Sequence, residues 1–518
     1  MTQDGVTLHF MRLNPYSAYS NPSAFLPYRG YIGVPAISNI NLALTNTSLH
    51  YDALFGKNTQ QPVTTIKLNS FVDQLDKKNN TLYSSLALNI IDFGFRTKHV
   101  KFGFSYRLRI EEYWGFNQDL FGLIAKGNMH YVGDDNPAIP KMSININAYQ
   151  EFGLGMQAEI TPNIYIGVRP KILFGLANIH TKSFQASLYT NAEDYSLKLN
   201  YNIDANIACI IPIDITTDTS FNVDIDPSEF ATQWQNAFKN VGTAIDLGLT
   251  YRINDMFGVS ASVLDLGFIR WKTNTSHITG SINPSSNTDS EGNLLFNGLS
   301  QDDIDQIQND PNTLQEKFAG YFPLHTTESQ PYFRALSARF LVEGYFNADK
   351  NNRFTALFQG RIINKQLIPS FTIAWNGTFL NIFDLCVNYT VAKKSYTNLG
   401  VGIGLNLGVF HIYAATDNIL AICQSKGVMR SLMNTNNVNI QMGVVFDWGK
   451  LKEKKLDRKG KVIVEETIPQ ETTANETAKE KKAAKTTKAD KSVKEKKADK
   501  TTETDKTDKK SKADQTNE

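Results

Sequence analysis

Apolar and polar residues alternate along the stretch NVNIQMGVVFDW at residues 437–448. A period of two predicts a β-strand with one apolar face and one mainly polar face. The polar face holds Asn437, Asn439, Gln441 and Asp447. The same alternation recurs along most of the chain, at 40–44, 82–90, 100–111, 142–156, 164–171, 245–252, 371–376, 383–390 and 399–408. The pattern therefore predicts an all-β protein.

Alternation alone fits both a soluble β-sandwich and a membrane barrel, but the connection lengths separate the two. Every second connection is short, at 97–98, 161–163, 254–255, 347–352 and 381, whereas most of the others are long, at 52–80, 113–140, 209–241, 272–332 and 417–436. Short turns on one side and long loops on the other are typical of outer-membrane barrels, whose turns face the periplasm. We therefore predict an antiparallel transmembrane β-barrel of about 14 strands, within 14–16.

The predicted barrel closes where the strand at 437–448, running from its outer end to the periplasmic end, pairs with the strand near Ile40. One further pair, 183–189 with 195–207, is predicted either as a membrane hairpin or as an extension above the membrane. Helices are predicted in the long loops at 70–78, 118–126, 227–239 and 300–318, two of which carry helix-start signals (Asp226-Pro227 and Ser300).

Composition divides the chain into three parts. Residues 1–37 combine Asn-Pro pairs and glycines with aromatic side chains, so we predict an irregular plug inside the lumen, with Phe10, Tyr16, Tyr19, Phe25 and Tyr28 lining a ligand pocket. Residues 38–450 are the predicted barrel. Residues 451–518 are rich in Lys, Glu, Asp, Thr and Ala and contain no Phe, Trp or Tyr, so we predict a disordered periplasmic tail.

Charge and hydropathy argue against a nucleic-acid-binding protein and against a helical membrane protein. The 518 residues are 41% hydrophobic with a formal net charge of +2, which gives no reason to expect nucleic acid as a partner. No run of about 18 apolar residues predicts a spanning helix. The first residues, MTQDGVTLHF, do not resemble a secretion signal. A barrel exported to the cell outer membrane requires one, so we expect that it has been removed.

Motifs of catalysis are not recognisable in the sequence. We find no nucleophile elbow, phosphate-binding loop or zinc spacing, and the three cysteines, at 209, 386 and 423, form no CxxC pair. The glycines of GVGIGLNLG at 400–408 alternate with large apolar residues, which indicates small inward positions of a strand. We expect no enzyme activity, no cofactor and no metal.

Charged residues on the predicted polar faces would point into the lumen. Opposite signs on neighbouring strands, Arg107 and Arg109 beside Glu151 and Glu159 beside Arg169, suggest ion-pair ladders that brace the interior. The same side chains could instead form a polar path or a site for an anionic headgroup, since Arg matches carboxylates well. The candidate lumen residues are Arg107, Arg109, Glu111, Glu151, Glu159, Arg169, Lys171, Arg339, Glu343 and Arg361.

Several segments resemble a known family, among them NPSAFLPYRGYIGVPAISNINLALTNTSLHYDALF, GVRPKILFGLANIHTKSFQASLYT and LDLGFIRW. The chain resembles uncharacterised Gram-negative outer-membrane barrels related to the long-chain fatty-acid transporter (FadL-like) superfamily, over residues 14–448. The resemblance implies roughly 14 strands and an N-terminal segment that enters the lumen. The lysine-rich tail departs from that family, whose members usually end near the last strand.

Two hypotheses about function remain open. The leading one is that the barrel binds or passes a small hydrophobic, lipid-like molecule through a plugged lumen. The alternative is a structural subunit of a larger envelope complex, such as secretion or barrel-assembly machinery, with the long loops and the tail as binding surfaces. Expected partners are therefore outer-membrane lipid, a hydrophobic small molecule, or protein subunits. A soluble all-β binding protein is a third hypothesis.

Overall fold

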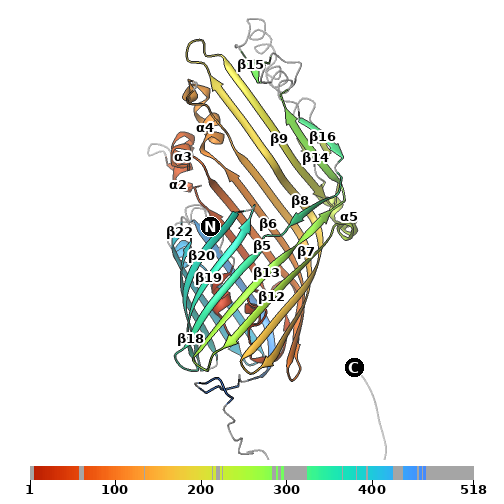
Figure 1. Ribbon diagram of the computed structural model, residues 1–518, viewed down its shortest axis with the longest axis vertical. Helices are drawn as coiled ribbons and strands as arrows, with labels where there is room; N and C mark the ends of the chain where they lie inside the picture. Colours follow the sequence, from red (N-terminus) through yellow and green to blue (C-terminus); the bar gives the residue numbers. More distant parts are fainter. Residues whose placement is uncertain are drawn as a thin grey trace, which may run out of the picture. The chain divides into compact units, whose positions relative to one another are not determined.

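A closed antiparallel β-barrel forms the body of the protein (Figure 1). The computed structural model describes residues 5–462 except 49, 58–63, 134, 213, 217–221, 225, 283–287, 290–292, 297–323, 329, 365, 381, 393–394, 424–435, 452–453 and 458. Within these residues fourteen strands close the wall, which confirms the predicted fold class. In order around the barrel they are β2 (Ile40–Asn46), β5 (Asn80–Arg96), β6 (Val100–Phe116), β7 (Met142–Thr161), β8 (Ile164–Thr190), β12 (Val241–Arg252), β13 (Phe257–Trp271), β18 (Arg339–Asn347), β19 (Asn352–Ile363), β20 (Gln366–Phe379), β21 (Phe383–Ala392), β22 (Ser395–Leu407), β23 (Phe410–Thr416) and β24 (Asn437–Lys450).

The barrel is apolar outside and polar inside, because alternate residues of each strand face opposite ways. Along β13, Phe257, Val259 and Phe268 are exposed on the outer face, whereas Ser260 and Ser262 are buried on the inner face. A soluble sandwich would bury the apolar face instead. This arrangement therefore excludes a soluble all-β binding protein. No helix in the described part of the chain is long and apolar enough to cross a membrane.

The connections sort as predicted. Those at 97–99, 162–163, 253–256, 348–351, 380–382 and 408–409 lie at one end, which we call the turn end. The other end, the loop end, holds the long connections and two short ones at 364–365 and 393–394. That the turn end faces the periplasm stays a prediction.

The seam of the barrel lies beside β24. β2 pairs with it, Ile40 opposite Met442, as predicted. β2 lies between β24 and β5 near the loop end. Nearer the turn end a separate strand, β1 (Tyr28–Gly33), lies between the same two strands and pairs with both. Between β1 and β2, residues 34–39 leave the ladder, and a Cβ at Gly443 would lie 1.9 Å from the Ser38 carbonyl oxygen. The wall therefore requires glycine at position 443.

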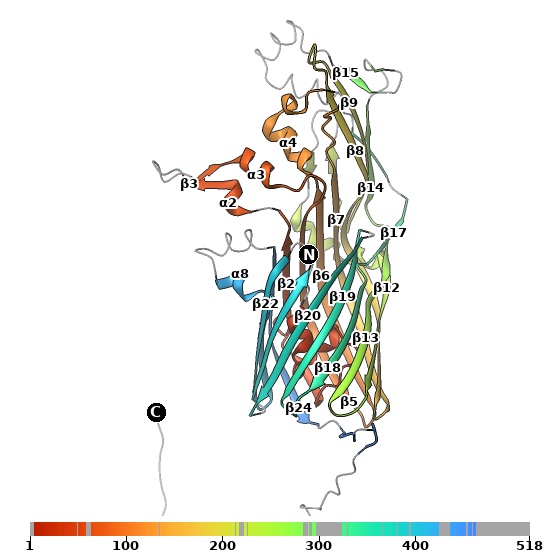
Figure 2. The same cartoon turned by 60° about the vertical axis from the view of Figure 1, so that its left-hand side comes forward.

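The predicted plug boundary at residue 37 is wrong, because the wall already begins with β1 at Tyr28. The segment inside the lumen, which we call the plug, is residues 5–27. It contains α1 (Val6–Phe10) and the short 3-10 helix η1 (Pro15–Tyr19), drawn in red inside the barrel in Figures 1 and 2.

Part of the structure rises beyond the loop end. β8 continues upward and pairs with β9 (Leu197–Cys209), so the predicted pair at 183–207 is an extension and not a membrane hairpin. The remaining strands are β3 (Phe55–Lys57), β4 (Thr64–Ile66), β10 (Asp214–Thr216), β11 (Asn222–Asp224), β14 (Thr275–Ser281), β15 (Leu294–Phe296), β16 (Leu324–Glu328) and β17 (Tyr332–Ala335).

Short helices cap the loop end, as Figure 2 shows for α2, α3, α4 and α8. The helix predicted at 118–126 is α4 (Gln118–Lys126), and the one predicted at 70–78 is displaced to α3 (Leu68–Gln74). The predicted helix at 227–239 is broken into η3 (Pro227–Glu229), α5 (Phe230–Gln233) and η4 (Trp234–Lys239). The others are α2 (Tyr51–Leu54), η2 (Asn128–Tyr131) and α8 (Ile419–Cys423). The prediction at 300–318 lies outside the described residues.

The first residues of the predicted tail are ordered against the turn end. The Lys454 ammonium lies 2.6 Å from Glu159, and the Leu456 amide donates to Asp255 at 2.5 Å. Leu456 is buried and forms a β-bridge with Val462. The predicted disorder is therefore wrong for this stretch. The described residues belong to one compact unit ending at Val462, and residues 463–518 lie outside them.

Candidate functional site

A network of buried charges crosses the lumen and contacts the plug. It consists of six cations and four acids from seven successive strands of the wall, β6, β7, β8, β12, β13, β18 and β19. The acids are Glu111, Glu151, Asp246 and Asp265, and the cations are Arg107, Arg109, Arg169, Lys171, Arg339 and Arg361. Glu151 lies 3.2 Å from Arg107, 3.0 Å from Arg109 and 3.6 Å from Lys171. We call this cluster the charged network.

Asp265 joins three strands of the charged network. Its carboxylate lies 2.8 Å from Arg109, 2.7 Å from Lys171 and 3.2 Å from Arg339. The residue sits in a β-bulge of β13, with a φ of 58°, and its amide donates to Asp246 at 2.7 Å. The extra residue of a bulge turns a side chain to the other face of a sheet. Simple alternation therefore missed Asp265, and the only sequence signal is the acid inside the apolar run Val263–Leu266.

The charged network holds the plug through Tyr19. The Arg107 and Arg169 guanidinium carbons lie 4.2 Å and 4.5 Å from the centre of its ring, and its hydroxyl donates to Asp92. Burial and the Asp92 carboxylate raise the pKa of the Tyr19 phenol well above its ordinary value, so the phenol stays a donor. Arg169 also donates to the Ala18 carbonyl at 2.8 Å.

The start of the plug is held by a different part of the wall, next to β23. Asp417, at the loop end of β23, accepts the Val6 and Thr7 amides at 3.2 Å and 2.8 Å and the Thr7 hydroxyl at 2.7 Å. From there the chain descends to the turn end, where Arg12 donates to Asn376 and to the Asn351 carbonyl. The plug therefore spans the depth of the lumen.

The last part of the plug lies against glycines of the wall. A Cβ at Gly167 would meet the Pro22 backbone at 2.1 Å, and one at Gly248 would meet the Ser23 amide nitrogen at 2.8 Å. The Ser23 and Thr250 hydroxyl oxygens are 2.7 Å apart. These glycines allow the plug backbone to approach the wall directly.

Eight of the ten predicted lumen residues lie together in the charged network, namely Arg107, Arg109, Glu111, Glu151, Arg169, Lys171, Arg339 and Arg361. Glu343 instead binds the plug, 2.6 Å from His9 and 2.8 Å from the Ser260 hydroxyl. The predicted pairing of Glu159 with Arg169 is wrong. Glu159 lies at the turn end, 3.8 Å from Arg96 and beside Lys454, because its register partner on β8 is Tyr165.

The plug aromatics pack against the wall. Phe10 and Tyr16 belong to an apolar cluster that includes Tyr413, and Phe25 lies under the Arg96 guanidinium, 4.8 Å from the ring centre. Tyr28 belongs to β1 and not to the plug. Tyr19 lines a cavity of about 40 Å³ between plug and wall, with Asp92, Lys101 and Arg169. A pocket for a lipid-like ligand has a volume of roughly 300–1,000 Å³, so this cavity is too small for one.

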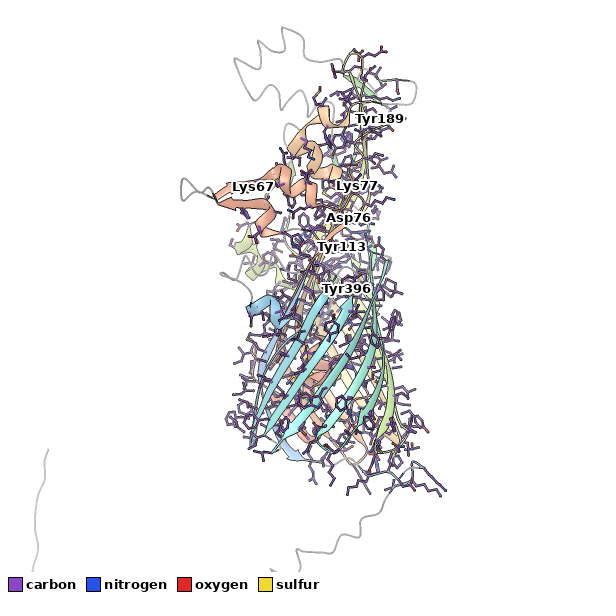
Figure 3. All side chains as sticks on the ribbon, turned by 90° about the vertical axis from the view of Figure 1, so that its left-hand side faces the viewer. Lys67, Asp76, Lys77, Tyr113, Tyr189 and Tyr396 are labelled. Carbon is purple, nitrogen blue, oxygen red and sulfur yellow. The ribbon has the colours of Figure 1, made fainter. Side chains whose placement is uncertain are left out.

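A larger cleft opens at the loop end, above the charged network. Its volume is about 590 Å³. Glu111 of the charged network contributes to its lining, and Figure 3 shows another lining residue, Tyr113, above the barrel rim. Apolar lining residues are Met142, Phe184, Leu336, Ile362 and Ile363; polar ones are Glu112, Asn145, Asn147, His180, Lys182 and Arg334. Sequence reasoning missed the cleft, because its residues come from six strands whose alternation marks no common site.

Among the polar residues that line this cleft, Arg334 contacts two others. Its guanidinium donates to Asn145 at 2.9 Å and lies 2.9 Å from the His180 ring nitrogen. The aliphatic residues Ile362 and Ile363 of β19 add apolar surface to the lining. A cleft whose lining combines charged and apolar side chains suits an amphipathic molecule.

No group of three or more His, Cys, Asp or Glu residues in the part of the chain that the structure describes could hold a metal ion. Cys209, Cys386 and Cys423 are free thiols, the first two of them buried.

The closed wall, its apolar outer face and its charged lumen define a transmembrane β-barrel of the outer-membrane type. Residues 22–417 match the model of a family of unknown function, DUF5723, and the chain belongs to that family. Its resemblance to an uncharacterised barrel family is thereby confirmed. No curated protein matches the chain.

Solved structures of several barrels are similar to this chain. The Pseudomonas putida toluene transporter TodX is 10% identical, with a TM-score of 0.37 over 83% of this chain and 92% of that one. A Pseudomonas aeruginosa FadL homologue is 8% identical, with a TM-score of 0.38 over 87% and 99%. The translocator domain of the autotransporter NalP from Neisseria meningitidis is 6% identical, with a TM-score of 0.31 over 85% and 95%. At TM-scores below 0.5 these likenesses carry no argument about what the chain binds.

Proposed function

We propose that this barrel binds a small amphipathic, lipid-like molecule in the cleft at its loop end and passes it inward when the plug moves. The observation that carries the proposal is the cleft of about 590 Å³. It is of ligand size, and its lining combines apolar and charged side chains. With the turn end in the periplasm, this cleft faces the outside of the cell.

Passage requires rearrangement, because the charged network and the plug fill the lumen below the cleft. Glu111 belongs both to the lining of the cleft and to the charged network, and Arg107 of the same network contacts Tyr19 of the plug. Glu111 is linked to the plug indirectly, through a chain of ion pairs that runs from Arg109 to Glu151 and from Glu151 to Arg107. A ligand that disturbs Glu111 would act on the plug along this chain. Nothing in this scheme needs a catalytic group, and we propose that the protein is not an enzyme.

The Arg334→Glu variant tests ligand binding. The purified full chain in detergent is titrated with dansyl-labelled undecanoic acid, and the dansyl emission gives Kd. Because the carboxylate probe meets an acid in place of a cation, we expect Kd to rise by about tenfold or more. Lys77→Glu makes the same charge change outside the cleft and should leave Kd unchanged. Wild-type protein that does not saturate with the probe, or equal Kd values for both variants, refutes the proposal.

A structural subunit of an envelope complex is the second candidate. It is favoured by apolar side chains exposed on the lobe above the loop end, where Ile124 and Met129 are 68% and 58% exposed. Gentle detergent extraction followed by mass spectrometry separates the two candidates. Stoichiometric protein partners around an empty cleft support the subunit, whereas a bound lipid-like molecule without protein partners supports the proposed binding protein.

A further inference from the structure

A second surface lies on the outside of the barrel, where β8, β12, β13 and β17 reach the loop end. Phe174 of β8 pairs with Val241 of β12, and Arg270 of β13 pairs with Phe333 of β17. Gly242 lies opposite Ile269, which places Val241 beside Arg270. Val241 and Phe333 are 44% and 62% exposed, and Arg270 is exposed as well. Two aromatic rings and a cation thus form one row on the outer face.

The helical segment 230–239 continues this row. Phe230, Trp234 and Phe238 recur every four residues and are all exposed. The Phe238 ring lies 4.9 Å from that of Phe174 and 5.5 Å from that of Trp234. Figure 1 shows α5 outside the wall, beside the upper ends of the strands. A buried side of the segment is fixed by Asn236, which donates to the Ile210 carbonyl at 2.8 Å.

The same rings continue down the membrane-facing wall. Phe174 contacts Phe152 with ring centres 5.6 Å apart, and Phe152 stacks on Tyr106 at 4.5 Å. The exposed segment is therefore continuous with the surface that faces lipid. Aromatic residues gather at the interface of a barrel, where acyl chains give way to headgroups. With the turn end in the periplasm, this places the segment at the outer interface of the membrane.

Three cations surround this aromatic surface. Lys239, Arg270 and Lys272 are all exposed, and the Lys272 amide donates to Asn240 at 2.8 Å, which brings the two lysine-bearing segments together. The Arg270 guanidinium lies 5.8 Å from the centre of the Phe333 ring. None of the three forms an ion pair with a described residue. The acids just before the segment are Asp226 and the half-buried Glu229.

We propose that Lys239, Arg270 and Lys272 bind the phosphate groups of a phosphorylated glycolipid of the lipid A type in the outer leaflet. The acyl chains would lie along Phe174, Phe238 and the wall below them. Unpaired Lys and Arg at a membrane surface attract anionic headgroups, and Arg matches phosphate oxygens with two donors. A protein partner is disfavoured, because the aromatic surface continues into the acyl-facing wall. This binding is independent of any ligand in the cleft.

Native mass spectrometry of the full chain tests the proposal. Detergent-purified protein is titrated with lipid A that carries two phosphates, with dephosphorylated lipid A and with phosphatidylglycerol. We expect the triple variant Lys239→Gln, Arg270→Gln, Lys272→Gln to bind the phosphorylated lipid A at least about tenfold more weakly than the wild type. The exposed lysines Lys77, Lys78 and Lys98, changed together to Gln, form the matched control.

Each outcome decides the proposal. Selective loss of phosphorylated lipid A in the first triple variant, with retained heat-modifiable migration as evidence of a folded barrel, supports it. Unchanged binding in that variant overturns it, as does equal loss in the control. Equal binding of dephosphorylated lipid A overturns the role of the phosphates. Phosphatidylglycerol that binds as tightly, and with the same dependence on the three cations, overturns the assignment to a lipid A type.

Discussion

Replacing Asp265 with Asn is expected to lower the free energy of unfolding of the barrel by about 3 kcal/mol or more. The change removes one negative charge from the centre of the charged network. It leaves three cations without their shared partner, Arg109, Lys171 and Arg339. A buried charge that loses its partner costs more than the intact pair contributes. Asn tolerates the positive φ of this bulge, so the expected loss comes from electrostatics and not from backbone strain.

Urea unfolding in lipid vesicles, followed by heat-modifiable migration and tryptophan emission, measures this effect. Glu193→Gln removes a negative charge from an exposed turn and should leave the midpoint within error of the wild type. If Asp265→Asn unfolds at the same urea concentration as Glu193→Gln, the network does not brace the barrel. Its charges would then be solvated rather than paired.

Replacing Asp417 with Ala is expected to release the start of the plug. The change removes three hydrogen bonds to the carboxylate, from the Val6 and Thr7 amides and the Thr7 hydroxyl. Hydrogen bonds to charged groups contribute roughly 1.5–3 kcal/mol each, so we expect on the order of a hundredfold or greater rise in the population with a displaced plug. Planar-bilayer recordings should show frequent openings in the variant and few in the wild type.

The Asp417→Asn variant should have an intermediate effect, because its side-chain oxygen still accepts hydrogen bonds. It should open more often than the wild type and less often than Asp417→Ala. Glu193→Gln again serves as the charge control. If Asp417→Ala remains as closed as the wild type, the hold on α1 does not control the plug.

The strands of the barrel wall could be predicted from the sequence, because each one shows alternating apolar and polar residues of its own. Alternation and connection lengths predicted the fourteen strands, the seam between β24 and β2, and the inward charges. The sequence could not show which charges meet. Glu159 and Arg169 lie on neighbouring strands, yet the register of β7 and β8 separates them.

The remaining misses have local physical causes. A β-bulge turns the Asp265 side chain to the inner face of the barrel, where simple alternation did not place it. The plug ends earlier than predicted because the wall begins with β1, and residues 34–39 separate β1 from β2. The tail looked too polar to order, but Leu456 and Lys454 find specific partners on the turns. The cleft depends on six strands and on the extension of β8 above the rim, so no single segment encodes it.

The central claim is that a ligand passes only when the plug moves, and a reversible lock on the plug tests it most directly. Ser23 and Thr250 face each other across plug and wall, so cysteines at both positions should form a disulfide. The background is Cys423→Ser, which removes the exposed thiol. Dansyl-labelled undecanoic acid is then followed into vesicles that contain Ser23→Cys, Thr250→Cys protein, oxidised or reduced, with Ser23→Cys alone as the control.

We predict that oxidation lowers the rate of probe entry by about tenfold or more and that reduction restores it, while the single-cysteine control responds to neither. Equal entry through the oxidised and reduced forms, with the disulfide verified by mass, would contradict the account. So would a reduced protein that admits no more probe than empty vesicles.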